Sequence, residues 1–361
     1  MADQWLMQIE KIETRAYRLK FKRQFSNANS SWGDRAGYVI KITTNSGLVG
    51  LGEAAPLPGW SGETLTQTAI ALDQMAAAAR IVALPDLQEI LQSHVQVPAA
   101  CHGIELAYLD LLAQSQQLPL YQWLNPQAQP NVCINGLLVS DQAAIAQAQT
   151  LVDQGYTTLK LKIGRHWEQD LALIQALRTQ LGFEIKLRLD LNQAWSLAQA
   201  IARLPELVPW QIEYLEQPLA ARDLVGMAKL HQLNQVAIAA DESVQTLEQL
   251  QALIKYQAAD FVILKPMVLG GILASYRAAQ IATQAGITPI ITTTLDGAIA
   301  RTGAIHLAAA LGGSAHGLAT GQWLAEDLFS PVDLLSETNP IRLGDQAGLG
   351  LSWQNMRIRV L

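Results

Sequence analysis

The 361-residue chain contains few cysteines, few charged residues and no long uninterrupted apolar run. Its two cysteines, Cys101 and Cys133, form no closely spaced pair, which excludes a disulfide framework and a cysteine-rich zinc site. We expect both to be buried apolar residues. The most apolar window, around residues 69 to 84, is interrupted by Asp73 and Arg80 and is too short for a membrane span.

Charged residues make up only 16% of the chain and hydrophobic residues 50%, which excludes a disordered protein and allows a large core. The formal net charge of −6 argues against nucleic acid or an anionic membrane as a partner bound through bulk charge. Charged residues also interrupt the N-terminal stretch that a signal peptide needs to be apolar, so we expect a cytoplasmic protein. Apolar helix faces serve barrel packing and subunit contacts alike, so a homo-oligomer is compatible with the sequence.

From about residue 131 onward, short apolar or β-branched runs alternate with longer segments of helical period, which predicts βα units around a parallel sheet. Eight strands with seven intervening helices close into a barrel, whereas an open dinucleotide-binding sheet needs a G-x-G-x-x-G turn that is absent here. The predicted strands begin at Val132, Thr158, Ile185, Gln211, Val236, Ala259, Ile287 and His316.

The first 130 or so residues follow a different pattern. Residues 4 to 24 and 35 to 54 alternate as antiparallel strands do, and helical patterns follow them. This pattern predicts an α+β domain before the barrel. The tail from residue 341 also has a strand-like pattern, and we expect it to pack against this N-terminal domain.

Five consecutive predicted strands end in ionisable side chains, spaced by 24 to 28 residues, which is one βα unit. The carboxyl ends of barrel strands carry the chemistry, so we expect these side chains at one rim. They are Lys160 and Lys162 on the second strand, Asp190 on the third, Glu216 on the fourth, Asp241 on the fifth and Lys265 on the sixth.

The three carboxylates would repel one another unless a cation lies between them, and all-oxygen ligation suits Mg²⁺ or Mn²⁺. Each acid alone has another explanation, as the cap of the following helix. Together with the lysines, however, they are costly to bury without an ion network. A carboxylate substrate on such a metal has an acidified α-proton. Lys162 is the expected base, because the Lys160 ammonium disfavours its charged form, and Lys265 is a second acid/base or a stabilising cation.

The motifs LKLKIG, LRLDLN, EYLEQP, AADES and ILKP resemble the muconate lactonising subgroup of the enolase superfamily over nearly the whole chain. The resemblance implies Mg²⁺ on the three carboxylates. It also implies a (β/α)7β modified TIM barrel with an α+β capping domain formed by the N-terminal region and the C-terminal tail. We expect the capping domain over residues 1–127 plus 324–361 and the catalytic barrel over residues 128–323.

Within the subgroup, the segment GEAAPLPGWSGETL is similar to the active-site loop of the o-succinylbenzoate synthases of menaquinone and phylloquinone biosynthesis. This resemblance implies a lyase, which dehydrates 2-succinyl-6-hydroxy-2,4-cyclohexadiene-1-carboxylate to 2-succinylbenzoate. Lys162 would remove the proton and protonate the departing hydroxyl, with Lys265 as a cation facing the ring. We expect substrate contacts at Arg35, Trp60, Ser61, Asn192, Gly270, Gly271, Thr292, Thr293 and Thr294.

Other interpretations stay open. Dipeptide epimerases share the core residues but carry an Asp-x-Asp pair at the eighth strand for the dipeptide ammonium, and this strand reads GLATGQW here. N-acylamino acid racemases need both lysines and no ammonium pocket. A silent barrel would bind a carboxylate without using an acid/base pair. Gly270 and Gly271 are also explained by a plain helix-start turn, and Asp296 either reaches the ligand or caps the next helix.

Overall fold

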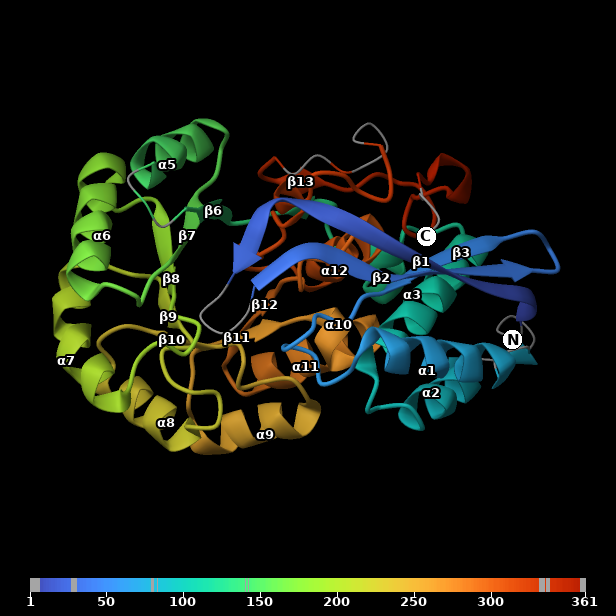
Figure 1. Cartoon of the computed structure of the whole chain (residues 1–361), viewed down its shortest axis with the longest axis horizontal. Coiled ribbons are helices and arrows are strands. Elements are labelled where there is room, and N and C mark those ends of the chain that lie inside the picture. Colours follow the sequence, from blue (N-terminus) through green and yellow to red (C-terminus); the bar gives the residue numbers. More distant parts are fainter. Residues whose placement is uncertain are drawn as a thin grey trace.

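The computed structural model describes residues 7–26, 31–78, 81–82, 84–139, 141, 143–330, 335 and 338–357. Its N-terminal part is an antiparallel sheet of order β3-β2-β1-β4 with helices packed beside it (Figure 1). The alternation predicted for this region is therefore confirmed, although residues 4 to 6 lie outside the described residues. The elements are β1 (Met7–Ser26), β2 (Ser31–Thr44), β3 (Val49–Ala54), α1 (Leu65–Ala78), β4 (Ile81–Val82), α2 (Leu84–Gln92) and α3 (Pro98–Ser115).

Helix α3 packs directly on strand β3 because small residues let the two backbones approach. A Cβ atom at Gly52 would overlap the Gly103 carbonyl, so this strand position accepts only glycine without a shift of the helix. All residues of α3 from Ala99 to Ala113 are buried. The helix therefore forms the core between the N-terminal sheet and the rest of the chain.

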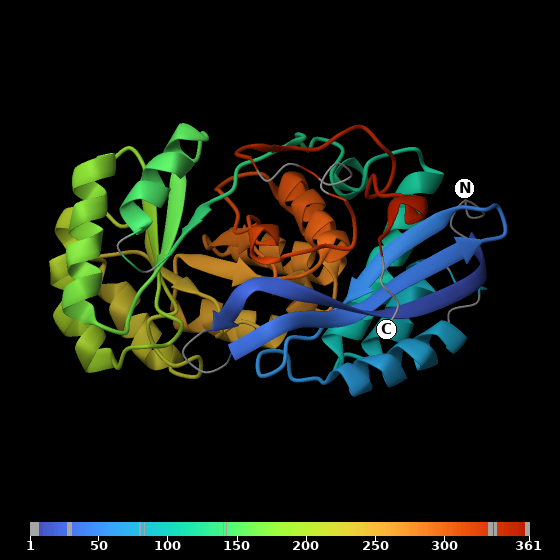
Figure 2. The same ribbon diagram turned by 45° about the horizontal axis from the view of Figure 1, so that its top comes forward.

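The second part of the chain is a curled parallel sheet of seven strands in the order β12-β11-β10-β9-β8-β7-β6, with helices outside it (Figures 1 and 2). Its strands are β6 (Gly136–Leu138), β7 (Thr158–Lys162), β8 (Lys186–Asp190), β9 (Tyr214–Glu216), β10 (Ile238–Ala240), β11 (Phe261–Leu264) and β12 (Thr288–Ile291). Its helices are α5 (Ala144–Asp153), α6 (Trp167–Leu181), α7 (Leu197–Leu207), α8 (Leu224–Leu233), α9 (Leu247–Tyr256), α10 (Pro266–Leu269), α11 (Ile272–Gln284) and α12 (Ala298–Leu311).

Two residues of the predicted eighth strand close the barrel. His316 forms a parallel bridge to Ile134, and Gly317 forms one to Thr292 beyond the end of β12. The expected strand from His316 is thus limited to this short contact. Gly317 fits because a Cβ there would lie 2.8 Å from Thr292 Oγ1. The predicted (β/α)7β barrel is confirmed.

The first predicted barrel strand, from Val132, is not continuous. It divides into β5 (Asn131–Val132), which pairs with β13 (Ile341–Arg342), and β6, which belongs to the barrel. Cys133 lies between the two and its side chain is exposed, which corrects the expectation of a buried residue, whereas Cys101 is buried. Both cysteines are free thiols.

The C-terminal segment returns to the N-terminal part. Leu324 bridges Phe21 of β1, the Leu349 amide donates to Asp110 of α3, and the Arg15 guanidinium lies over the Trp353 ring. Apart from the two residues of β13 and a short 3-10 helix, the described tail is irregular, so the further strand expected there is mostly absent. These contacts support the expected domain boundaries, which stay a prediction. No helix in the described ranges is long and apolar enough to cross a membrane.

Buried carboxylates join the two parts of the molecule. Glu53 of β3 accepts hydrogen bonds from the Gly297 and Ala300 amides at the start of α12. Glu105 of α3 accepts one from the Leu273 amide at the start of α11. Acids placed at helix N-termini satisfy amides that have no partner within the helix and complement the helix dipole. The start of each of these two barrel helices is therefore fixed by a side chain from the N-terminal part.

We predict that Glu105→Gln weakens the dependence of stability on pH. Burial raises the pKa of Glu105 from its ordinary 4.5 to about 7, so folding favours the protonated form. The stability from this group is fully present below about pH 4.5 and is lost as the pH rises through about 7, a change on the order of 3 kcal/mol. Urea unfolding at pH 5 and pH 8 measures it: the difference should be smaller in the variant. An equal difference in both proteins would contradict the assignment.

Candidate active site

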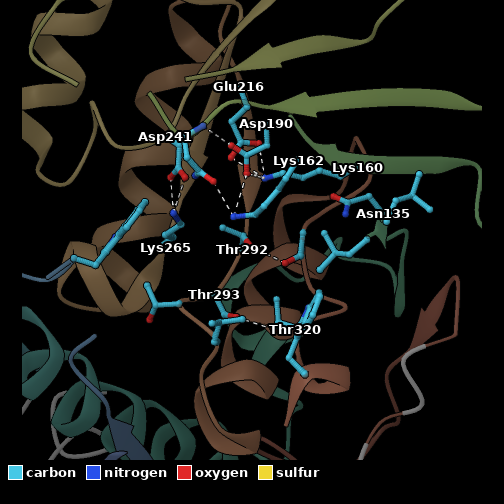
Figure 3. Close-up of a pocket in the computed structure, with 18 of the residues that line it drawn as sticks. Asn135, Lys160, Lys162, Asp190, Glu216, Asp241, Lys265, Thr292, Thr293 and Thr320 are labelled. Atoms are coloured by element: carbon cyan, nitrogen blue, oxygen red, sulfur yellow. Dashed lines mark hydrogen bonds and ion pairs between the residues drawn. The ribbon is translucent and has the colours of Figure 1, made fainter. Parts of the chain in front are cut away.

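A pocket of about 340 Å³ opens at the carboxyl ends of the barrel strands (Figure 3). All six ionisable groups that the strand ends predicted line it. Of the expected substrate contacts, five line it as well. Together the predicted residues found in its wall are Trp60, Lys160, Lys162, Asp190, Asn192, Glu216, Asp241, Lys265, Thr292, Thr293 and Thr294.

Lys160 lies among the carboxylates. The register of the parallel strands places Lys162 beside Asp190 and Asp190 beside Glu216, so these side chains emerge at one level. Lys160 Nζ is 3.0 Å from Asp190 Oδ2 and 2.6 Å from Glu216 Oε2. Burial alone would lower the pKa of Lys160, but the two carboxylates outweigh it and hold that pKa well above its ordinary value. Lys160 is therefore a permanent cation.

The carboxylates differ in their affinity for protons. Burial, together with the negative charges of Asp190 and Asp241, raises the pKa of Glu216 to about 8. Burial opposes ionisation of Asp190 too, but the Lys160 and Lys162 ammonium groups outweigh it and lower its pKa. The site thus holds more negative charge than Lys160 alone compensates.

The donor set fits a hard divalent cation. Among the described residues, no three acidic, histidine or cysteine side chains surround a common point as metal ligands. The three predicted ligands contact ammonium groups instead, Asp190 and Glu216 through Lys160 and Asp241 through Lys265. They are nevertheless buried oxygen donors at the ends of three adjacent strands, and their mutual repulsion is what a bound Mg²⁺ or Mn²⁺ would relieve.

Lys162 and Lys265 approach the pocket from opposite sides (Figure 3). Lys162 Nζ donates to Asn192 Oδ1 at 2.8 Å, and Asn192 Nδ2 donates to Glu242 Oε1 at 3.2 Å. Lys265 Nζ lies 2.6 and 2.7 Å from the two Asp241 oxygens. Each of the two amino groups is thus oriented by a neighbouring side chain. Asn192, expected to contact substrate, also positions Lys162.

The rest of the pocket wall is mostly apolar. The ring of Trp60 faces Lys265, with Nζ 3.9 Å from its centroid. Thr293 and Thr320 share a hydrogen bond of 2.8 Å between their hydroxyl groups. The apolar lining residues are Trp32, Leu57, Trp60, Leu137, Leu138, Val139, Leu295 and Trp323.

Arg35 is not a pocket residue, which corrects its expected role. Its side chain is 1% exposed, and Nη2 lies 3.1 Å from Asp296 Oδ1. Asp296 also accepts a hydrogen bond of 2.5 Å from the Thr294 hydroxyl, which lies at the pocket. Asp296 therefore neither lines the pocket nor caps α12, whose N-cap is Gly297. Arg35 therefore affects the site indirectly: it pairs with Asp296, and Asp296 fixes the position of the Thr294 side chain.

Ser61, Gly270 and Gly271 also lie outside the pocket wall. The Ser61 hydroxyl donates to the Leu57 carbonyl, and both Ser61 and Gly270 line a second cavity beside α9 and α11. Gly271 is the N-cap of α11, where a Cβ would overlap the Glu105 carboxylate. That carboxylate occupies the place at the helix start that an anionic ligand would need. The two glycines thus form the helix-start turn.

Sequence reasoning missed several residues of the site. Asn135 is a polar residue within the otherwise apolar VCINGLL run, and this interruption is the signal in the sequence that marks it. Thr320 and Trp323 belong to the GLATGQW segment of the predicted eighth strand, where no residue was expected to contact substrate. Trp32 and Leu57 come from the N-terminal part; Leu57 lies in the GEAAPLPGWSGETL segment, in which only Trp60 and Ser61 were expected to contact substrate. Glu242 was present in the AADES motif without a role of its own.

Comparison with known proteins gives a consistent result. Residues 143–357 match the family described as enolase C-terminal domain-like, and residues 12–124 match the N-terminal domain of mandelate racemase and muconate lactonizing enzyme. A hydrophobic dipeptide epimerase from Enterococcus faecalis is 33% identical, over 96% of this chain and all of its own length. Its crystal structure with Mg and L-Leu-L-Tyr has a TM-score of 0.88, with the same coverage of both chains.

Two further relatives have other activities in their names. An N-succinyl-L-Arg/Lys racemase from Bacillus cereus is 27% identical over 84% of each chain. The structure of a muconate lactonizing enzyme from Pseudomonas fluorescens, complexed with muconolactone, is 27% identical, has a TM-score of 0.86 and covers 97% of this chain and all of that one.

We predict that Arg35→Met destabilises the protein by about 3–5 kcal/mol, because it leaves the buried Asp296 carboxylate without its cation. Urea unfolding measures the loss. The double variant Arg35→Met/Asp296→Leu should lose less than the two single variants combined. Arg18→Met removes an exposed ion pair with Asp34 from the same strand pair and should cost under about 1 kcal/mol. Equal losses for Arg35→Met and Arg18→Met would contradict the buried role.

Proposed function

The chain belongs to the enolase superfamily, in its muconate lactonizing subgroup, and we propose that it is a metal-dependent racemase or epimerase. Its proposed substrate is an N-acylated amino acid with an apolar side chain. The observation that carries the proposal is the approach of Lys162 and Lys265 to one pocket from opposite sides, beside three carboxylates (Figure 3). Names among the relatives support proton transfer at an α-carbon more than the dehydration expected from sequence.

Asp190, Glu216 and Asp241 would hold Mg²⁺, which would bind the substrate carboxylate and stabilise the negative charge left by removal of the α-proton. Support comes from their donor chemistry, and from the Mg in the structure of the Enterococcus faecalis relative. Lys160 remains protonated, and its positive charge helps to hold the pKa of Asp190 below its ordinary value. It is an electrostatic neighbour rather than a proton carrier.

Lys162 and Lys265 divide the proton transfer between them. One amino group takes the proton from one face of the α-carbon, and the other donates a proton to the opposite face, which inverts the centre. Asn192 and Asp241 fix the directions of the two amino groups before substrate arrives. Such preorganisation matters because a small misplacement of a base costs much of its catalytic effect.

The pocket favours an acylated amine over a free ammonium group. In the part of its wall that the structure describes, the only acid besides the three proposed ligands is Asp141, at the exposed rim. The barrel end that reads GLATGQW contributes Gly317, Thr320 and Trp323, none of them charged. The apolar lining matches an apolar substrate side chain. A dipeptide is the alternative substrate.

One contact keeps the expected o-succinylbenzoate synthase reaction as a second candidate. The Lys265 ammonium lies 3.9 Å from the centroid of the Trp60 ring, so this position already accepts an aromatic face. A cyclic diene on its way to an aromatic product would use the same cation–π attraction. Formation of 2-succinylbenzoate from the cyclohexadiene substrate tests this candidate directly.

We predict that the wild-type protein, with Mg²⁺ in D₂O, introduces deuterium at the α-carbon of both enantiomers of N-acetylleucine. Lys162→Ala should abolish exchange of one enantiomer and Lys265→Ala that of the other, because each lysine faces one side of the α-carbon. Racemisation should fall about 10²–10⁴-fold in either variant. Proton NMR of the α-hydrogen measures exchange, and chiral chromatography measures racemisation.

Lys229→Ala, on the outer helix α8, is the matched control and should leave exchange unchanged. Full activity in Lys162→Ala would contradict the mechanism. Faster turnover of L-Leu-L-Leu than of N-acetyl- and N-succinylleucine would show that the proposed substrate class is wrong.

We predict that millimolar Mg²⁺ raises the midpoint of thermal unfolding of the wild type, because a ligand that binds the folded state stabilises it by mass action. Asp190→Asn and Glu216→Gln remove ligand charge and should show a much smaller rise. Circular dichroism at increasing Mg²⁺ measures the midpoints. The same rise in wild type and both variants would place the metal elsewhere.

A further inference from the structure

Asn135 is a buried polar residue in the pocket wall that the proposed acid–base chemistry does not use. It lies between β5 and β6, its side chain is part of the pocket lining, and the residue is 1% exposed. Its backbone amide donates to the His316 carbonyl at 2.9 Å, which ties it to the closure of the barrel. The position of the residue is therefore fixed by the fold.

The orientation of its side-chain amide is fixed as well. Arg188 Nη1 donates to Asn135 Oδ1 at 3.2 Å. Arg188 is itself immobilised, by Glu213 Oε2 at 2.6 Å from Nε, by the Ala315 carbonyl at 2.7 Å from Nη1 and by the Tyr214 ring. Arginine has donors only, so a flipped amide would set its NH₂ group against the guanidinium. The amide oxygen must face Arg188, and Nδ2 is left for another partner.

Asn135 Nδ2 has no hydrogen-bond partner in the described structure. A buried donor without an acceptor costs free energy in the empty protein, and a ligand oxygen that accepts from it recovers this cost. Polar groups of this kind determine specificity, because an analogue that lacks the oxygen leaves the donor unpaired. Asn135 Nδ2 is thus available to donate a hydrogen bond to an acceptor on a ligand.

We infer that Asn135 Nδ2 donates to an oxygen of the substrate's acyl group and so selects N-acylated amino acids; this inference rests on the proposed function. The three carboxylates lie on β8 and β9 and just after β10, and Lys265 follows β11, so the substrate carboxylate and α-carbon belong on that side. Asn135 precedes β6 at the other edge of the sheet, and Figure 3 shows it across the site from Lys265. The α-carbon has two other substituents, the side chain and the acylated amine. The side chain packs against the apolar wall, which leaves the acyl group beside Asn135 Nδ2.

Two variants separate the donor from its structural contact. Asn135→Ala removes the whole amide, whereas Asn135→Asp keeps an oxygen for Arg188 and removes the donor. We expect both to raise the KM for N-acetyl-L-leucine about tenfold or more, with a much smaller change in kcat. Asn131→Ala, at an exposed position of β5, is the matched control and should leave both constants unchanged. Circular dichroism and the Mg²⁺-dependent rise in unfolding midpoint verify that each variant is folded.

Changing the substrate tests the contact from the other side. N-thioacetyl-L-leucine replaces the acyl oxygen by sulfur, a weaker acceptor, and should have a higher KM than N-acetyl-L-leucine in the wild type. In Asn135→Ala, that difference should disappear. N-succinyl-L-leucine locates the acceptor: an equal effect of Asn135→Ala on both acyl substrates assigns the acyl carbonyl, and a larger effect on the succinyl substrate assigns the distal carboxylate.

An unchanged KM in a folded Asn135→Ala protein would overturn the inference and leave the proposed function standing. So would a ratio of acetyl to thioacetyl KM values that is the same in wild type and variant, since a purely structural role affects both substrates alike. A wild-type protein that neither racemises nor exchanges any of the acylated substrates would overturn the proposed function, and the inference with it.

Discussion

The attraction between buried ammonium and carboxylate groups at the carboxyl ends of the barrel strands is the interaction on which the rest of the site depends. Asp190 and Glu216 would repel each other in a dry environment, and Lys160 lies between them, within 3.0 Å of both. Lys265 pairs with the third carboxylate, Asp241. Such pairs need good geometry to offset the loss of hydration. The parallel register supplies it, because it brings the ends of β7, β8 and β9 to one level.

The scaffold around this cluster has two separate tasks. Tyr214, Ala239, Ile263 and Ile290 form a small apolar cluster beside Arg188. Each precedes a pocket residue by two positions, so its side chain lies on the same face of the sheet and the cluster forms the floor of the pocket. Around the rim, residues from the N-terminal part complete the wall, and buried acids of that part hold the starts of α11 and α12. The arrangement joins a rigid floor to a wall made by a different segment of the chain. The N-terminal part therefore contributes Trp32, Leu57 and Trp60 to the apolar wall, whereas the ionisable groups at the strand ends all come from the barrel.

The sequence predicts the barrel and the ionisable cluster well, because both follow from a short-range rule: one polar residue at the end of each apolar strand, once per βα unit. It predicts poorly what depends on long-range packing. Arg35 was expected to contact substrate, and only the fold shows it buried against Asp296, 261 positions away. Gly271 was expected to contact substrate, and only the fold shows that the Glu105 carboxylate from α3 lies against it. The first predicted strand was divided in two because half of it pairs with β13 from the tail.

The central claim is that two lysines act on opposite faces of one α-carbon. The most direct measurement is the isotopic content of the first product molecules when protonated N-acetyl-L-leucine is racemised in D₂O with Mg²⁺. If two bases act, the D enantiomer carries solvent deuterium at its α-carbon from its first appearance, because the donating lysine never held the substrate's own proton. Early D enantiomer that retains the original α-hydrogen would show transfer by a single base and would contradict the account.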